Sequence, residues 1–259
     1  MPGMEAMGTT DLPGAVLAPY SDAQVRFAIE AWPMRAAEEL RSARIFRALS
    51  RAARVAGLSE PWPTRFAAAM RDEVRHARLC VTVGTRLGAL SPKYDVRPVR
   101  ARLAGLPNPL IRTAALLLVE VAMGETISMY LFRACRRATV EPLTRSALGM
   151  IVGDEVRHQR LGWTGMASLW PMLSEPLRAA VQREAARGLA ACEQQTARPA
   201  MLWLQKRQPF DPAYAALGVL HPEARVEAFY SAIERLVLPR LSRVGLDGPL
   251  AWKSRYHQS

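Results

Sequence analysis

Runs in which Val, Ile and Thr alternate with polar residues are nearly absent from this chain, although a half-buried strand needs such alternation. The apolar positions fall instead in long stretches dominated by Ala, Leu, Arg and Met, which are good helix formers. We therefore predict an all-α protein. With 259 residues, half of them hydrophobic, the chain is long enough for one large domain or for a domain with an extension.

Start and stop signals predict four long helices. Ser21 and Gln24 form a capping box that opens the first helix, and Gly57 lies just beyond its end. Pro33 is expected to kink or restart this helix, because proline cannot donate the backbone hydrogen bond of a helix interior. The predicted helices run from about 22 to 55, 61 to 87, 109 to 138 and 142 to 170.

The connections between these helices are short, long and short, and the long one covers residues 88–107. This order is typical of two helical hairpins joined by a crossover, as in ferritin-like four-helix bundles. We predict a mobile tail at 1–20, the bundle at 21–173 and a C-terminal helical extension at 174–259 that packs on the bundle. Within the extension, residues 200–211 are predicted to be irregular.

The two predicted hairpins are copies of one another. Glu39–Ala52 aligns without a gap on Glu125–Ala138, with Glu, Ser, Phe-Arg-Ala and Arg-Ala at matching positions. Further along, the pentapeptide at Asp72–His76 meets the identical pentapeptide at Asp154–His158 after an adjustment of four residues in the loop. Each copy therefore carries a Glu, then about thirty residues, then Glu-x-x-His.

This repeated pattern has the composition of a two-metal site. Positions i and i+3 share one face of a helix, so each Glu-x-x-His offers a carboxylate and an imidazole to the same point. Four Glu and two His suit two iron ions, or manganese or a mixed pair, bridged by carboxylates. A single Glu-x-x-His is common on exposed helices, but two copies at matching distances from a repeated Glu favour a metal site. The predicted ligands are Glu39, Glu73, His76, Glu125, Glu155 and His158.

Three further acidic residues lie near these positions in the sequence. Glu120 interrupts the same apolar stretch as Glu125 and is a candidate for a third carboxylate or for a contact to a ligand. Asp72 and Asp154 point about a quarter turn away from the neighbouring Glu. Each is predicted either to orient a histidine on the facing helix through its other nitrogen or to form a simple ion pair with an Arg.

Charge and cysteine content restrict the compartment and the partners. The net charge of +12 is carried almost wholly by arginine and is compatible with a solvated surface, nucleic acid or an acidic protein such as a ferredoxin or a carrier protein. Cys80, Cys135 and Cys192 are far apart and form no C-x-x-C, which favours a reducing compartment. No signal peptide is recognisable, and the apolar stretch 114–123 is too short to span a bilayer. We expect a cytoplasmic protein without a membrane segment.

The double Asp-Glu-x-Arg-His after an upstream Glu resembles the non-haem di-iron carboxylate proteins of the ferritin-like superfamily. The resemblance covers residues 30–165, and it implies a di-iron site at the six predicted ligands. That group includes monooxygenases, acyl-carrier-protein desaturases, arylamine N-oxygenases, rubrerythrin and bacterioferritin. An arylamine N-oxygenase is expected to carry a further histidine one turn before the Glu of the fourth helix. Ile151 occupies that position, which counts against this subgroup.

Three functions remain open at this point. The leading hypothesis is an oxidoreductase that activates O2 to oxygenate, hydroxylate or desaturate a small-molecule or carrier-bound substrate. It needs an external electron donor, such as an acidic ferredoxin, because no flavin or iron–sulfur motif is visible. The alternatives are a ferroxidase that stores iron and a non-catalytic helical scaffold or nucleic-acid binder. A homodimer is compatible with each, and an acidic protein partner is favoured over nucleic acid.

Overall fold

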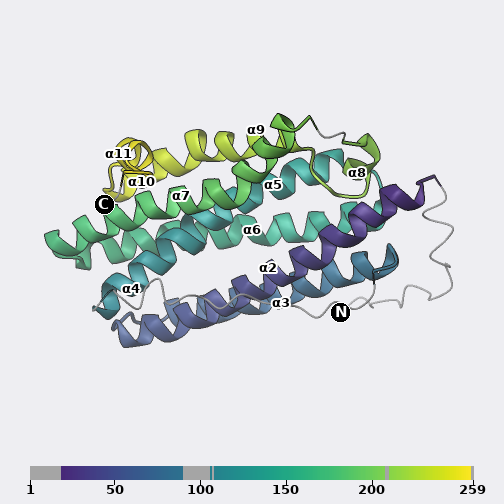
Figure 1. Ribbon diagram of the computed structural model, residues 1–259. Helices are drawn as coiled ribbons and strands as arrows, with labels where there is room; N and C mark the ends of the chain where they lie inside the picture. The colour runs from purple at the N-terminus through teal and green to yellow at the C-terminus, as the bar shows by residue number, and fades with distance from the viewer. Residues whose placement is uncertain (1–18, 90–105, 107, 208–209, 258–259) are drawn as a thin grey trace.

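The computed structural model describes residues 19–89, 106, 108–207 and 210–257 of the chain (Figure 1). All regular secondary structure in these ranges is helical, so the prediction of an all-α fold is confirmed. The helices form a ferritin-like bundle with further helices packed along one side. The predicted mobile tail at 1–20 and the long connection at 88–107 lie almost entirely outside the described residues.

The first hairpin consists of α2 (Asp22–Val55) and α3 (Trp62–Arg86). Ser21 caps α2 through the predicted capping box, in which Gln24 accepts a hydrogen bond from the Ser21 backbone N–H at 2.7 Å. The chain then turns at Gly57, whose φ of 74° lies in the left-handed region that glycine tolerates. Helix α2 continues without interruption past Pro33, so the expected restart at this residue was wrong.

The second hairpin consists of α4 (Pro109–Leu116), η2 (Leu117–Met123), α5 (Gly124–Ala138) and α6 (Pro142–Leu169). The predicted third helix is therefore present, but its middle turns form a π-helix, η2, which no pattern in the sequence indicates. A Cβ atom on Gly162 of α6 would lie 2.6 Å from the Ala122 Cα of η2. The two backbones can approach this closely only because residue 162 has no side chain.

Most of the C-terminal helices lie along the α5 and α6 side of the bundle, and α8 also packs against α2 (Figure 1). Helix α7 runs through Pro199 to Gln205, so the prediction of an irregular stretch at 200–211 was wrong for its first half. Gly245, with φ of 104°, ends α10 as its left-handed cap. The elements that follow α6 are η3 (Trp170–Met172), α7 (Glu175–Gln205), α8 (Pro212–Ala216), α9 (Pro222–Ala232), η4 (Ile233–Val237), α10 (Leu238–Val244) and α11 (Gly248–Lys253).

The helix that contains the apolar stretch 114–123 is longer than the stretch itself. By length and composition, Pro109–Ala138 could cross a membrane, but 67% of its most apolar window is buried inside the protein. The central helix of a packed bundle has the same properties, because it is covered on every side by other helices. Its apolar character is therefore explained by its place between α6, α7 and α2.

Two apolar clusters fill the interior, and each of the four bundle helices contributes to both. One cluster contains Phe46 and Met166, and the other contains Trp32 and Leu148. Along α2, α3 and α6, the predicted metal ligands fall where the helix passes from one cluster to the other, and Glu125 of α5 lies beside Met123 and Ile127 of the first cluster. The fold thus encloses one polar layer between two apolar ones.

Candidate metal centre

All six predicted ligands are buried in this polar layer, with relative exposures between 0% and 5%. Glu39 comes from α2, Glu73 and His76 from α3, and Glu125 from α5. Glu155 and His158 come from α6. Each helix therefore directs its polar positions inward, which the i, i+3 spacing of Glu-x-x-His allows without disturbing the helix.

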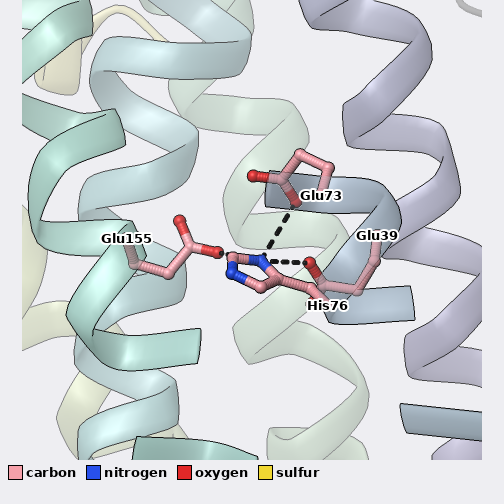
Figure 2. A group of neighbouring side chains, drawn as sticks. All are labelled: Glu39, Glu73, His76 and Glu155. Carbon is pink, nitrogen blue, oxygen red and sulfur yellow. Dashed lines mark ion pairs between the residues drawn. The ribbon is translucent and has the colours of Figure 1, made fainter. Parts of the chain in front are cut away.

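The His76 imidazole lies at the centre of one group of carboxylates (Figure 2). Its Nδ1 atom is 3.4 Å from Glu39 Oε2, 3.5 Å from Glu73 Oε2 and 3.5 Å from Glu155 Oε1. One possible ligand atom from each of these four residues lies within 4.8 Å of all the others. Such a group has the size and the donor types of a metal site.

His158 occupies the equivalent place in the second copy of the repeat. Its Nδ1 atom is 2.7 Å from Glu73 Oε1 and 3.5 Å from Glu155 Oε2. Glu125 joins this side, because its carboxyl group contacts Glu155 and interacts electrostatically with Glu73 and His158. Glu73 and Glu155 thus lie between the two histidines, where a carboxylate can bridge two ions.

The outward-facing nitrogen of each histidine is held by an aspartate from the facing helix. His76 Nε2 is 3.0 Å from Asp154 Oδ2, and His158 Nε2 is 3.2 Å from Asp72 Oδ2. When Nε2–H donates to a carboxylate, the lone pair of the neutral ring is at Nδ1, which faces the buried carboxylates. Both aspartates therefore orient the imidazoles for binding at the inner nitrogen.

The same aspartates also pair with two partly exposed arginines. Arg75 Nη2 is 2.9 Å from Asp72 Oδ1 and also contacts Asp154. Arg157 contacts Asp154 and lies 3.5 Å from Asp72. The contacts of these aspartates therefore include both kinds that were considered, a hydrogen bond to a histidine and ion pairs with arginines. Arg75 and Arg157 occupy the same position of the repeated pentapeptide, and that repetition was the signal that could have identified them.

The pKa values of two buried glutamates and of both histidines in the cluster are raised, for different physical reasons. Burial raises the pKa of Glu73, and burial together with the Glu155 and Glu73 carboxylates raises the pKa of Glu125 well above its usual value. Burial lowers the pKa of His76, but the nearby carboxylates of Glu39 and Glu73 outweigh burial and raise the pKa to about 11. The pKa of His158 is raised against its burial by Asp72 and its neighbouring glutamates. Without a cation, the layer therefore retains protons.

The polar atoms that face the centre have no other partners. Both carboxylate oxygens of Glu73, one of Glu155 and the Nδ1 atoms of both histidines are buried without a hydrogen bond. Leaving such atoms unsatisfied is costly, whereas coordination to metal ions would satisfy all of them. Four carboxylates also balance the charge of two divalent cations when both imidazoles are neutral. The residues present therefore fit a pair of iron or manganese ions.

Glu120 lies apart from this group. Its carboxylate pairs with Arg41 of α2 at 3.0 Å, and both side chains are about one quarter exposed. Glu120 belongs to the π-helix η2, whereas Glu125 lies in the following helix α5. The described contacts of Glu120 are with Arg41 and not with the buried histidines. The structure thus places it at the margin of the bundle.

A family model described as P-aminobenzoate N-oxygenase AurF matches residues 36–238 of the chain. The matched range begins before Glu39, contains all six buried residues of the cluster and extends into α10. Searches of curated proteins and of solved structures found no match.

Proposed function

We propose, from the premise that this chain belongs to the AurF family of di-iron oxygenases, that it transfers oxygen to the amino group of a small aromatic amine. Membership of the family makes the protein an oxidoreductase with a di-iron centre. It favours oxygenase chemistry over the ferroxidase alternative and over a non-catalytic scaffold. The aromatic amine is taken from the description of the family, and the buried cluster in the matched range supports the assignment.

Ile151 does not exclude the chain from this family. From the sequence alone, this residue counts against an arylamine N-oxygenase, because a histidine is expected one turn before Glu155. That interpretation was wrong, since the family model matches across this position. Ile151 is completely buried in the apolar cluster that contains Trp32 and Leu148, so the chain fills the position by packing.

The proposed iron ligands are Glu39, Glu73, His76, Glu125, Glu155 and His158. The observation that carries this assignment is the set of buried, unsatisfied carboxylate and imidazole atoms that face one another. Glu73 and Glu155 would contribute to holding both ions, because each lies near both histidines. When bound, the two irons supply the redox equivalents and the open coordination positions that O2 activation requires.

The protein's own groups position and protect this centre. Asp72 and Asp154 accept hydrogen bonds from the Nε2–H groups, which keeps the Nδ1 lone pair of each histidine available to bind a metal ion. Phe46 packs its ring against His158 with centroids 5.2 Å apart, and the apolar clusters on either side exclude water. The net reaction of the proposed first step is R–NH2 + O2 + 2 e− + 2 H+ → R–NHOH + H2O.

The two electrons and the substrate come from outside the chain. We propose a one-electron carrier protein as donor, and we retain both a free and a carrier-bound amine as substrate forms. A cytoplasmic location is a further part of the proposal, supported by the three scattered cysteines, and a homodimer is compatible with it.

Iron loading followed by product analysis tests the proposal. Anaerobic addition of ferrous iron should leave about two irons per chain, as expected for a four-Glu, two-His site. Glu73→Ala and Glu155→Ala should each abolish this stoichiometry while the helical content is retained. The loaded protein, given O2, a reductant and 4-aminobenzoate or related anilines, should form the hydroxylamine. Failure to retain iron, or consumption of O2 without oxidation of any amine, would contradict the proposal.

A further inference from the structure

The outer surface of α3 and α6 carries a group of exposed arginines, and the acidic residues of these two helices are buried or only partly exposed. Arg71, Arg75 and Arg78 lie at i, i+4 and i+7 on α3, and all three are exposed. Arg157 and Arg160 lie at i and i+3 on α6 and are exposed as well. We call these five residues the α3/α6 face. The two helices are neighbours, joined by the contacts of Arg75 and Arg157 with the aspartates.

The positive charge of this face is not neutralised by its own helices. The acidic residues of α3 are Asp72 and Glu73, and those of α6 are Asp154 and Glu155. Both glutamates are buried in the metal cluster, and both aspartates already pair with Arg75, Arg157 and the histidines. The side chains of Arg71, Arg78 and Arg160 have no acidic partner among the described residues.

This face lies directly above the two histidines of the cluster. From His76, one hydrogen bond leads to Asp154, and Asp154 contacts Arg75 and Arg157. The side chains of these arginines are 50% and 60% exposed. A continuous series of two polar contacts therefore connects a buried imidazole with solvent, and His158 has an equivalent series through Asp72.

We propose that the α3/α6 face is the docking surface for an acidic one-electron carrier protein, and this inference rests on the proposed oxygenase function. Two reduced carriers each deliver one electron, and two ferric ions become ferrous while the carriers become oxidised. The charge of the face attracts an acidic partner, and its position brings that partner's redox group close to the iron-binding histidines. A nucleic acid would be attracted by the same charge but could not use this position.

The test is a comparison of two triple variants with a plant-type [2Fe–2S] ferredoxin as the acidic probe. Arg71→Glu, Arg78→Glu and Arg160→Glu together reverse the face without touching Asp72 or Asp154. A matched control changes exposed arginines on other surfaces, namely Arg26→Glu, Arg137→Glu and Arg183→Glu. Each triple variant lowers the formal net charge from +12 to +6, because every substitution changes the charge by two.

Binding of the ferredoxin is measured by calorimetry at low and high ionic strength, with metal-free and with iron-loaded protein. The face variant should bind at least about tenfold more weakly, and the control should stay within about twofold of the parent chain. The face variant should also slow reduction of the ferric protein by reduced ferredoxin but not by dithionite. Binding to the metal-free chain remains measurable if iron loading fails, so a failure of the oxygenase proposal is distinguished from a failure of docking.

Three results would overturn the inference. One is equal weakening in both triple variants, which would make the attraction a property of total charge. The second is unchanged ferredoxin binding in a correctly folded face variant. The third is tighter binding of a single-stranded RNA homopolymer than of ferredoxin at the same face, which would assign the face to nucleic acid.

Discussion

Replacing Asp154 by Asn should weaken iron binding although Asp154 is not itself a proposed ligand. The substitution keeps the shape of the side chain and one acceptor oxygen for His76 Nε2, but it removes the negative charge. That charge strengthens the hydrogen bond and makes the imidazole a better donor at Nδ1. Loss of such a partner typically costs about 10- to 100-fold in metal affinity, or about 1.4–2.8 kcal/mol.

The structure indicates which of the two aspartates has the larger effect on iron affinity. Asp154 lies 3.0 Å from its histidine and its side chain is 11% exposed, whereas Asp72 lies 3.2 Å away and is 20% exposed. Hydrogen bonds between charged groups gain strength as solvent is excluded, so Asp154→Asn should have the larger effect. Glu120→Gln is the matched control, because it removes the same charge from a partly exposed ion pair with Arg41. Its iron affinity should remain within about twofold of the parent chain.

The assay is competition for ferrous iron between the protein and a coloured chelator under anaerobic conditions. Thermal unfolding of each metal-free variant shows whether the fold is preserved. Iron affinity of Asp154→Asn within twofold of the parent chain would refute the reasoning. So would an equal loss in Glu120→Gln, because that result would place Glu120 among the groups that act on the metals.

Three further predictions concern stability. Gly162→Ala should destabilise the chain by about 1–3 kcal/mol, because the new Cβ would meet the Ala122 backbone at 2.6 Å. Gly153→Ala should not destabilise it, because nothing lies within 4 Å of the new Cβ, and urea denaturation distinguishes these outcomes. Glu193→Gln should cost about 1–3 kcal/mol, because its carboxylate accepts hydrogen bonds from an arginine and two tyrosines that hold the C-terminal helices; a normal melting temperature would contradict this. The metal-free chain should lose stability as the pH rises from about 6.5 towards 11. The pKa of His76 is raised to about 11 in the folded protein, so its protonated form stabilises the fold only below that pH. A melting temperature that rises over this pH range would contradict the prediction.

The four-helix bundle and the six buried residues at its centre could be predicted because the sequence contains two copies of the same helical hairpin. Two copies of Glu and Glu-x-x-His fixed which positions face inward, and the structure buries all six of these side chains. The restart at Pro33 and the irregular stretch just after Pro199 were wrongly expected, because proline lowers local helix propensity by about 3 kcal/mol, an amount that packing along a long helix can outweigh. Both residues lie inside continuous helices.

The π-helix η2 could not be predicted, because its cause is tertiary. Helical spacing arguments assume 3.6 residues per turn, and a π-helix changes the angular position of every residue before it. Glu120 therefore cannot be placed by counting back from Glu125, and the repeat alignment, which pairs it with Met34, gives no guide. The close packing of Ala122 on Gly162, and of Val119 on Gly188 of α7, involves residues distant in the sequence.

The reciprocal aspartate–histidine contacts between the two hairpins give one chain the kind of internal symmetry that an isologous dimer has. Each half supplies the group that orients the other half's imidazole, as two identical subunits would do across a twofold axis. Neither hairpin alone contains a complete set of donors with their supports. Iron retention therefore reports whether the two halves are docked, and separately expressed halves should recover it only on reassociation.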